Sequence, residues 1–177
     1  MRIIGGEFKG RRLNVPKNIT ARPTTDFARE GLFNILNSRI EFENCDMLDL
    51  FAGTGSIGFE FISRGARSVL AVEQSRRHTD FMRSVSKTLG VDNHIAVRSD
   101  VFRYLMSSNK DFDFVFADPP YDLDALPDIP VLVFKHNIIR EKGYLVLEHS
   151  AKHQFDEHPH FDSRRKYGNV HFSFFRP

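Results

Sequence analysis

The sequence has little of what would indicate secretion, disulfide cross-linking or membrane insertion. Cys45 is the single cysteine among 177 residues, so an internal disulfide is impossible and a reducing compartment is expected. The longest apolar stretch, residues 129–134, contains Pro130 and is far shorter than a membrane span. The first four residues pass at once into two glycines and then basic side chains, which fits no secretory signal. These absences lead us to expect a cytoplasmic protein without membrane contact.

Composition excludes disordered and fibrous classes. Hydrophobic residues make up 41% and charged residues 27% of the chain, close to the globular average. A mass of 20.5 kDa leaves room for one compact domain with a modest extra segment.

The formal net charge of +2 is unevenly distributed. Residues 1–29 carry seven basic side chains against Glu7 and Asp26, a balance of +5, and the rest of the chain has a balance of −3. A basic arm on a near-neutral body suits a polyanion, although a charged run is also an ordinary solvated face. A second basic cluster, 164–166, could extend the same surface. We therefore expect a basic N-terminal arm and connector over residues 1–23 and a catalytic or binding domain over residues 24–177.

The arm reads as a β-hairpin, and the rest as alternating strands and helices. In residues 1–16, short apolar runs flank a turn at Gly5-Gly6. A helix is predicted to open at Thr24-Thr25-Asp26, where a hydroxyl cap and an early acid satisfy free N–H groups, with Ala28, Leu32, Ile35 and Leu36 facing the core. Further strands are predicted at Met47–Phe51, Val69–Val72, Ile95–Arg98, Phe112–Ala117, Tyr144–Leu147 and His171–Phe175. Further helices are predicted at Ser56–Ser63, Ser75–Leu89 with Gly90 as C-cap, Val101–Ser107, and from about Pro130 to His136. This alternation predicts a doubly wound, mostly parallel α/β sheet.

A glycine-rich loop follows the first strand of that sheet. Gly53, Gly55 and Gly58 form G-x-G-x-x-G between a strand and a helix, where glycine allows a tight turn and close approach of backbone to a ligand. Glu73 stands at the end of the next strand, where a carboxylate can accept hydrogen bonds from two ribose hydroxyls. Asp100 follows the third strand and could accept from an adenine amino group. Three strand ends therefore predict an adenosine-containing cofactor.

The residue before the loop favours one such cofactor. Asp49 lies four residues before Gly53 and places negative charge in the crevice, whereas a dinucleotide brings a pyrophosphate there. The carboxylate suits the cationic groups of S-adenosyl-L-methionine better.

The fourth strand runs into Asp118-Pro119-Pro120-Tyr121. Two prolines leave few N–H donors, and the Asp118 carboxylate and the Pro119 carbonyl remain as convergent acceptors for the two hydrogens of an exocyclic amine on a base. Such a contact frees the amine lone pair for attack on a methyl group, and Asp118 can take up the proton. Tyr121 offers an aromatic face to a base turned out of its stack. Guanine N2 and adenine N6 suit these acceptors equally.

The loop and the tetrapeptide together resemble class I S-adenosylmethionine-dependent amino-methyltransferases. The N-terminal motifs (Met1 to Gly6, Lys9 to Leu13 and Arg22 to Asp26) resemble one family in particular, the bacterial 16S ribosomal RNA guanine-N2 methyltransferases, and the similarity covers most of the chain, including Leu147 to Ser150. The resemblance implies a seven-stranded sheet with the last strand antiparallel, preceded by a β-hairpin arm. It implies 16S ribosomal RNA or the small ribosomal subunit as partner. A monomer is expected as the working state.

The candidate site residues are then as follows. Catalysis is assigned to Asp118, Pro119, Pro120 and Tyr121. Cofactor binding is assigned to Asp49, Phe51, Gly53, Gly55, Glu73, Gln74, Asp100, Val101 and Asp118, with adenine beside Gln74 and Val101. RNA binding is assigned to Lys9, Arg11, Arg12 and Arg22. Phe27-Ala28 departs from the family pattern, in which a basic and a β-branched residue often precede Arg29.

Other chemistries remain as alternatives or are set aside. A DNA adenine-N6 methyltransferase would use the same acceptors, but no residues remain for a target-recognition domain. A nicotinamide-dependent oxidoreductase would use the same glycine loop, and a non-catalytic RNA-binding factor would use the same arm. The eight histidines lack a companion cysteine pair or helical metal motif, so no metal is expected.

Overall fold

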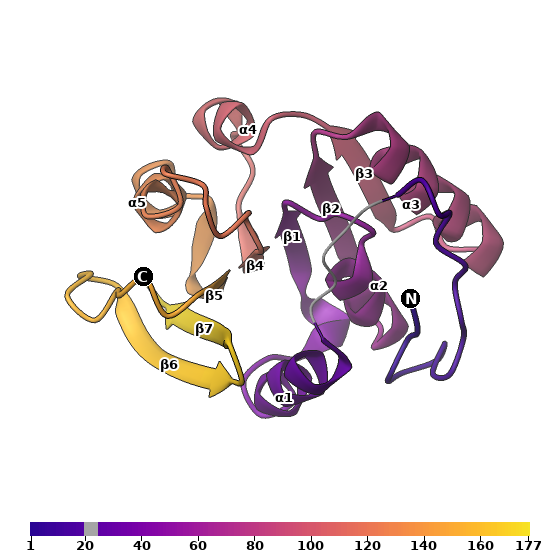
Figure 1. Cartoon of the computed structure of the whole chain (residues 1–177), viewed down its shortest axis with the longest axis horizontal. Coiled ribbons are helices and arrows are strands. Elements are labelled where there is room, and N and C mark those ends of the chain that lie inside the picture. The colour runs from indigo at the N-terminus through magenta and orange to yellow at the C-terminus, as the bar shows by residue number, and fades with distance from the viewer. Residues whose placement is uncertain (20–24) are drawn as a thin grey trace.

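The computed structural model describes residues 1–19 and 25–177, and its centre is a seven-stranded sheet (Figure 1). The strands lie in the order β3-β2-β1-β4-β5-β7-β6, and all are parallel except that β7 runs antiparallel to both of its neighbours. The predicted doubly wound, mostly parallel sheet is thereby confirmed. The strands are β1 (Asp46–Leu50), β2 (Ser68–Glu73), β3 (His94–Arg98), β4 (Phe112–Ala117), β5 (Ile139–His149), β6 (Phe161–Tyr167) and β7 (Val170–Phe175).

Helices cover both faces of the sheet. They are α1 (Asp26–Leu36), α2 (Ser56–Ser63), α3 (Arg76–Leu89), α4 (Val101–Ser107) and α5 (Asp128–Lys135), and a 3-10 turn spans Phe42–Asn44. One apolar cluster joins α1, α2 and α3 to one sheet face, and a second joins α4 and α5 to the other. Within β1, Met47 belongs to the first cluster and Leu48 to the second, because successive side chains of a strand point to opposite faces.

Local capping explains where two of the helices begin. The Thr25 hydroxyl accepts a hydrogen bond from the Ala28 N–H at 3.2 Å and caps α1, as predicted. Helix α3 has the predicted ends, with the Ser75 hydroxyl as N-cap and Gly90 at φ 72° as C-cap. Helix α5 begins two residues before the predicted Pro130. Proline fits there because the first-turn N–H groups of a helix have no partner within the helix.

The predicted antiparallel hairpin of residues 1–16 is confirmed in a short form, with a longer turn than predicted. The two arms pair through the bridge between Arg2 and Arg12, through hydrogen bonds between Met1 and Leu13 in both directions, and from the Ile3 N–H to the Arg11 carbonyl at 3.0 Å. The turn spans residues 5–10 instead of Gly5-Gly6 alone, because the turn is held by α2: the Glu7 N–H donates to the Ser63 carbonyl at 2.6 Å and the Phe8 N–H to the Ser63 hydroxyl at 2.9 Å. The segment is therefore docked on the domain, and its Ile3, Phe8 and Leu13 are buried in the core.

The C-terminal part holds the other differences from expectation. The sequence pattern gave one strand after residue 150, whereas the chain forms the antiparallel pair β6 and β7. Strand β6 has a mostly exposed pattern of polar and basic side chains, so it lacks the apolar alternation that identifies a half-buried strand. Strand β5 is also longer than the predicted Tyr144–Leu147, since its first half contains the exposed Glu141 and Lys142.

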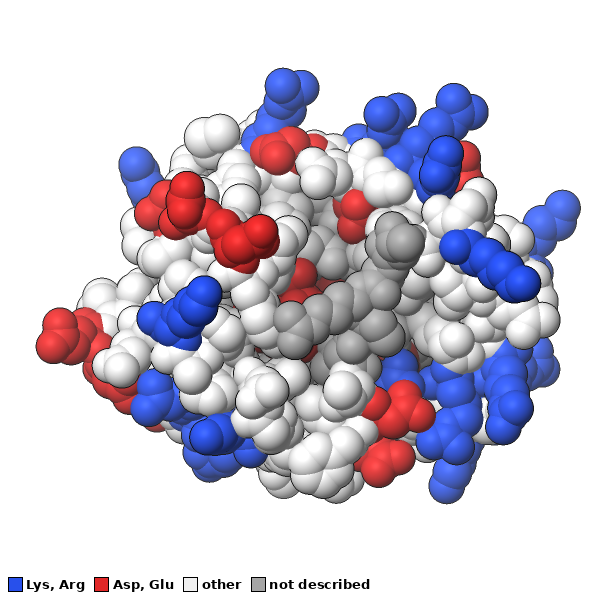
Figure 2. Space-filling model, in the orientation of Figure 1, with Lys and Arg blue, Asp and Glu red and all other residues white. Residues whose placement is uncertain are grey.

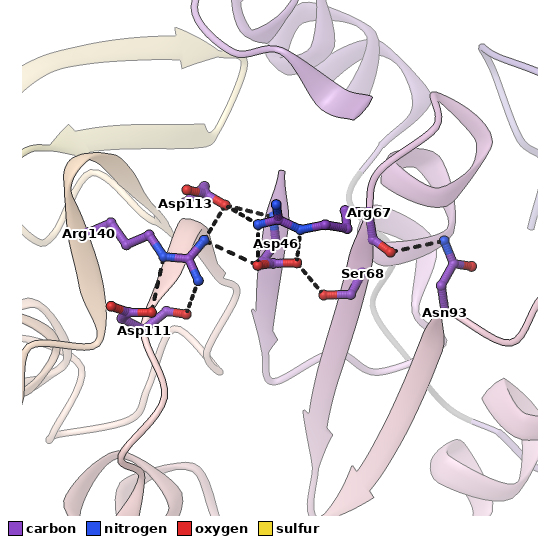
Figure 3. Close-up of polar contacts among 7 residues, drawn as sticks. All are labelled: Asp46, Arg67, Ser68, Asn93, Asp111, Asp113 and Arg140. Carbon is purple, nitrogen blue, oxygen red and sulfur yellow. Dashed lines mark hydrogen bonds and ion pairs between the residues drawn. The ribbon is translucent and has the colours of Figure 1, made fainter. Parts of the chain in front are cut away.

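A network of ion pairs ties the amino ends of the central strands together (Figure 3). Asp46 at the start of β1 accepts from Arg67, and also from Arg140 at 3.1 Å. Arg140 of β5 also donates to Asp113 of β4 at 2.6 Å. The pKa of Asp46 is held well below its usual value, chiefly by the hydrogen bond from Arg67. This edge of the sheet is thus fixed by salt bridges, which leaves the opposite edge for a ligand. Among the described residues, no helix is long and apolar enough to cross a bilayer.

Candidate active site

A cavity of about 640 Å³ opens at the carboxyl edge of the parallel strands, the edge at which open α/β sheets bind ligands. Its walls are the residues that follow β1, β2 and β4, the start of α4 and the end of β5. Figure 1 shows β1 and β2 ending at this edge, and Figure 2 shows acidic side chains inside a central hollow. Among the described residues, the carboxylates that line the cavity are Asp49, Glu73, Asp100, Asp118, Asp122 and Glu148, against one lysine, Lys152. Such a lining attracts a cation.

The loop after β1 is held in a conformation that glycine makes possible. Gly53 and Gly55 have φ of 53° and 74°, and Phe51 has φ 57°, a region that bulky side chains rarely adopt and that concentrates at functional sites. Gly58 is needed for a different reason. A Cβ there would lie 3.0 Å from Val69 Cγ1 and 3.2 Å from Asp49 Oδ2, so this glycine lets α2 approach the sheet closely.

Asp49 lines the cavity from a buried position, with 2% of its surface exposed. Its Oδ2 accepts a hydrogen bond from the Gly58 N–H at 3.1 Å. Burial raises the pKa of Asp49 from 3.8 to about 7, against the lowering effect of that hydrogen bond and with a further increase from the nearby Glu73. A buried carboxylate of this kind gains most from a cationic partner.

Glu73 and Asp100, the carboxylates predicted to bind the adenosine part of the cofactor, also accept hydrogen bonds from nearby backbone N–H groups. The Glu73 oxygens accept from the Gly53 N–H at 2.9 Å and the Ser75 N–H at 2.8 Å, so the glycine loop and the start of α3 fix its position. Each carboxylate oxygen has a second acceptor site, which leaves Glu73 able to accept from two hydroxyls. Asp100 is the N-cap of α4 and its Oδ1 accepts from the Arg103 N–H at 2.9 Å.

The tetrapeptide after β4 faces the same cavity. Asp118 is half-buried, Pro119 is buried and Pro120 is exposed. The Pro120 carbonyl accepts from the Leu123 N–H at 3.0 Å, whereas the Pro119 carbonyl has no hydrogen-bond partner within the described part of the chain. The Tyr121 hydroxyl donates to Glu148 Oε1 at 2.8 Å, which fixes the orientation of the Tyr121 ring at the end of β5.

The structure brings most of the predicted site residues into one cavity. These are Asp49, Phe51, Gly53, Glu73, Gln74, Asp100, Val101, Asp118, Pro119, Pro120 and Tyr121. Gly55 is the exception: it is the buried N-cap of α2, and a Cβ on it would meet Met82 Sδ at 2.8 Å. The absence of a side chain at Gly55 therefore makes room for Met82 in the core.

Three of the predicted RNA-binding residues, Lys9, Arg11 and Arg12, are described and do not line this cavity. Arg12 lines a second cavity next to it. Lys9 and Arg11 are exposed on the N-terminal segment, where Arg11 stacks over the Phe8 ring at 5.3 Å from its centre. Arg22 falls outside the described residues.

Sequence reasoning missed several residues that line the cavity. Glu148 is 3% exposed and holds Tyr121; its place at the carboxyl end of a strand, like that of Glu73, was the available signal. His78 lies with Nδ1 3.5 Å from Glu73 Oε1. Lys152 and Thr54 also line the cavity, and nothing in their local sequence distinguishes them from ordinary surface residues.

Comparison with known proteins gives a consistent result. The family model described as Conserved hypothetical protein 95 matches residues 1–176. The ribosomal RNA small subunit methyltransferase D of Escherichia coli K12 is 35% identical over 148 residues, which cover 84% of this chain and 71% of that protein. The protein of the same name from Buchnera aphidicola subsp. Baizongia pistaciae is 32% identical over 149 residues, which cover 84% of this chain and 75% of that protein.

A solved structure extends the match to the whole fold. The Escherichia coli protein yhhF, described as a candidate methyltransferase, superposes with a TM-score of 0.87 at 28% identity, and the match covers 99% of this chain and 96% of that one. The chain therefore belongs to the Conserved hypothetical protein 95 family and is a relative of the ribosomal RNA small subunit methyltransferase D proteins.

Proposed function

We propose that this protein transfers a methyl group from S-adenosyl-L-methionine to the exocyclic N2 of a guanine in the 16S ribosomal RNA of the small ribosomal subunit. The observation that carries the proposal is the convergence in one cavity of Asp49, Glu73 and the Asp118 to Tyr121 loop. The names of the curated relatives support ribosomal RNA of the small subunit as the substrate class.

The cavity fits the proposed methyl donor in charge and in hydrogen-bonding groups. When bound, S-adenosyl-L-methionine supplies a methyl group activated on a cationic sulfur. Asp49 would face the cationic part, and its buried carboxylate would be stabilised there in the ionised form. Glu73 would accept from the ribose hydroxyls with its remaining lone pairs, and the adenine would lie beside Gln74 and Val101. Phe51, Gly53 and Asp100 would complete the contacts.

The loop after β4 would hold and activate the target amine. The Asp118 carboxylate and the Pro119 carbonyl would accept the two hydrogens of the amine, which favours a pyramidal nitrogen with an available lone pair. Asp118 would then take up the proton that the methylated amine releases. The Tyr121 ring, held by Glu148, would stack on a base turned out of its helix.

The carboxylates near Tyr121 favour guanine over adenine. Guanine carries an N1–H donor beside its exocyclic amine, whereas adenine presents an N1 acceptor at the equivalent place. Asp118, Asp122 and Glu148 all line the cavity, as Tyr121 does. Carboxylates accept from two adjacent donors of guanine, and they repel the lone pair of adenine N1.

A monomer is proposed as the working state. Strand β6 is one of the two edge strands of the sheet, the other being β3, and it carries the exposed Arg164, Arg165 and Lys166. Charged side chains on an edge strand oppose pairing with a second copy.

Methyl transfer to three substrates in parallel tests this function. Labelled S-adenosyl-L-methionine is incubated with unmodified small subunits, naked 16S ribosomal RNA and duplex DNA, and the labelled base is identified. We expect label on guanine N2 of the small-subunit RNA. Label on DNA adenine would overturn the substrate and the base, and tight binding of nicotinamide dinucleotide without methyl transfer would overturn the reaction.

The Asp118→Ala variant tests the division of labour within the cavity. Loss of general-base and acceptor contacts commonly costs 10²–10⁴-fold, so kcat should fall by roughly a hundredfold or more. The Kd for S-adenosylhomocysteine, measured by calorimetry, should stay within a few-fold. Asp124→Ala, which removes an exposed carboxylate of the same loop, should leave both values unchanged. An equal loss of cofactor binding in Asp118→Ala would contradict the assignment.

A further inference from the structure

A second cavity, of about 750 Å³, adjoins the first on the side of the N-terminal segment. It is lined by the N-terminal segment, by the beginning of α1 and by the glycine loop. Thr54 and Ser56 line both cavities, so the glycine loop forms their common wall. The Thr54 hydroxyl also donates to Met1 Sδ at 3.6 Å, which ties the N-terminal segment to that wall.

The charge of the second cavity is opposite to that of the first. Within the described part of the chain, its ionisable side chains are Arg2, Arg12, Arg29 and Asp26, three cations against one anion. Figure 2 shows basic side chains gathered at the lower right of the hollow, where Figure 1 places the N-terminal segment. A ligand with a cationic part in one cavity and an anionic part in the other would match both.

The arginines of the second cavity differ in how firmly they are held. Arg29 is 3% exposed; its Nη2 donates to Asp26 Oδ1 at 2.7 Å and to the Arg2 carbonyl at 2.8 Å. Its buried Nε has no hydrogen-bond partner among the described residues. Arg2 pairs with Asp26 at 3.3 Å.

Arg12 is exposed and forms no ion pair with a described residue. Asp26 is already shared between Arg2 and Arg29, so the positive charge of Arg12 is left for a ligand.

We propose that the second cavity binds the phosphodiester of a nucleotide that neighbours the target base in the RNA, with Arg12 as its principal charge contact. The inference rests on the proposed function, since a base placed at Asp118 brings its flanking phosphates to the rim of the first cavity. Arg12 then fixes the register of the RNA strand, while Arg29 and Asp26 hold the cavity wall. Asn14, which also lines the cavity, supplies an amide that can both donate to and accept from an adjacent nucleotide.

Equilibrium binding of naked 16S ribosomal RNA to Arg12→Gln, in the presence of S-adenosylhomocysteine, tests the site. Arg12 is exposed, so the substitution leaves the core intact. We expect roughly tenfold weaker binding, and a plot of log affinity against log salt that is shallower by about 0.7, the value for one lost phosphate contact on a single strand. The matched control Lys110→Gln removes an exposed cation that precedes β4 at the opposite edge of the sheet and should stay within twofold of the wild type. Equal effects of the two substitutions would overturn the proposal.

Neutral phosphates in the RNA give a second, independent readout. Single methylphosphonate linkages are placed on either side of the target guanine in a fragment of the small-subunit RNA. One linkage should weaken binding to the wild-type protein and have no effect on Arg12→Gln, and an equal cost in both proteins would overturn the site. Binding is measured separately from transfer, so the two proposals fail differently. If the neutral linkage weakens binding only when Arg12 is present but no methyl group is transferred, the proposed function is contradicted. If a methyl group is transferred but this dependence on Arg12 is absent, the phosphate site in the second cavity is contradicted.

Discussion

At the scale of single residues, Asp49 couples the cavity to pH. Its carboxyl is buried, and its pKa is raised to about 7 mainly by desolvation. Below that pH the group carries a proton, which must leave before the carboxylate can face a cationic ligand. We therefore expect the affinity for S-adenosyl-L-methionine to increase between pH 6 and pH 8. Calorimetry in two buffers of different ionisation enthalpy should show proton release on binding near pH 6.

The Asp49→Asn variant isolates this effect. It should bind the cofactor more weakly at pH 8, roughly tenfold or more as expected for a lost charge contact in a buried site, and its affinity should change little with pH. A pH dependence that persists in Asp49→Asn would contradict the role given to Asp49.

The residue scale also shows how far the sequence predicted the site. Asp49, Glu73, Asp100 and Asp118 were predictable because each stands at the end of a recognisable strand, and parallel strands bring their carboxyl ends together. Gly55 was predicted to contact the cofactor, whereas the atom that a Cβ there would meet belongs to Met82. A glycine motif shows where a side chain is excluded, but it does not show whether a ligand or a protein side chain occupies that space. Lys152 joins the cavity through a loop after β5, and no local pattern encodes that contact.

At the scale of elements, the N-terminal segment depends on one close approach to α2. Gly6 has φ 73°, and a Cβ on it would lie 1.8 Å from the Ser63 carbonyl oxygen. Gly10 has φ 84°, but a Cβ on it would meet nothing within 4 Å. Alanine at either position pays the cost of a left-handed conformation, roughly 1–2 kcal/mol. Only Gly6→Ala must also push the segment away from α2.

Comparison of Gly6→Ala with Gly10→Ala measures how strongly this segment is docked. We expect Gly6→Ala to lower the free energy of unfolding by about 2 kcal/mol more than Gly10→Ala, because it breaks the contacts to Ser63 and exposes Ile3 and Phe8. Urea denaturation of the two variants gives the difference. The affinity of Gly6→Ala for RNA should also fall, because the N-terminal segment that lines the second cavity is displaced. Equal stability of the two variants would show that the close approach is not what holds the segment.

Elements were predictable where local chemistry and burial agree. Helix α3 has a serine cap, a glycine C-cap and a buried apolar face, and each of these is visible in the sequence. Strand β6 is set by its pairing with β7 along 161–167, although its own residues are largely charged or polar. The turn of the N-terminal hairpin is longer than predicted for a related reason, because the N–H groups of Glu7 and Phe8 donate to Ser63 of α2. Tertiary partners of this kind lie outside any sequence window.

At the scale of the whole molecule, the amino ends and the carboxyl ends of the parallel strands have different roles. The amino edge is closed by the ion pairs of Asp46, Arg67 and Arg140 (Figure 3), and the carboxyl edge keeps its carboxylates for ligands. Buried ionisable groups on both sides of the sheet then decide how stability depends on pH. Burial lowers the pKa of His94 and of His149 from 6.5 to about 4, and it raises that of Asp49 to about 7.

The signs of these contributions differ. Between pH 4 and pH 6.5 the unfolded chain binds protons on His94 and His149 that the native state does not, so the free energy of unfolding rises with pH. Asp49 acts in the opposite direction between pH 3.8 and pH 7, because the native state holds a proton that the unfolded state has lost. For these three groups the difference is about one proton, or about 1.4 kcal/mol per pH unit. Burial also lowers the pKa of His158 and of His171, which adds to the rise with pH. We expect stability to rise from pH 4.5 to pH 6.5 and to pass through a maximum close to pH 7.

Urea unfolding at closely spaced pH values tests this balance, and His94→Phe identifies its source. The His94 ring stacks on Phe59 with centres 4.1 Å apart, so phenylalanine keeps the stacking and removes the proton-binding site. The variant loses the contact to Ser86 at 3.2 Å, which shifts its stability at every pH but not the slope against pH. With one histidine removed, the slope between pH 4.5 and pH 6.5 should fall by about one proton, or about 1.4 kcal/mol per pH unit. A slope equal to that of the wild type would mean that His94 does not contribute to the increase in the free energy of unfolding with pH, and that other titratable groups cause it.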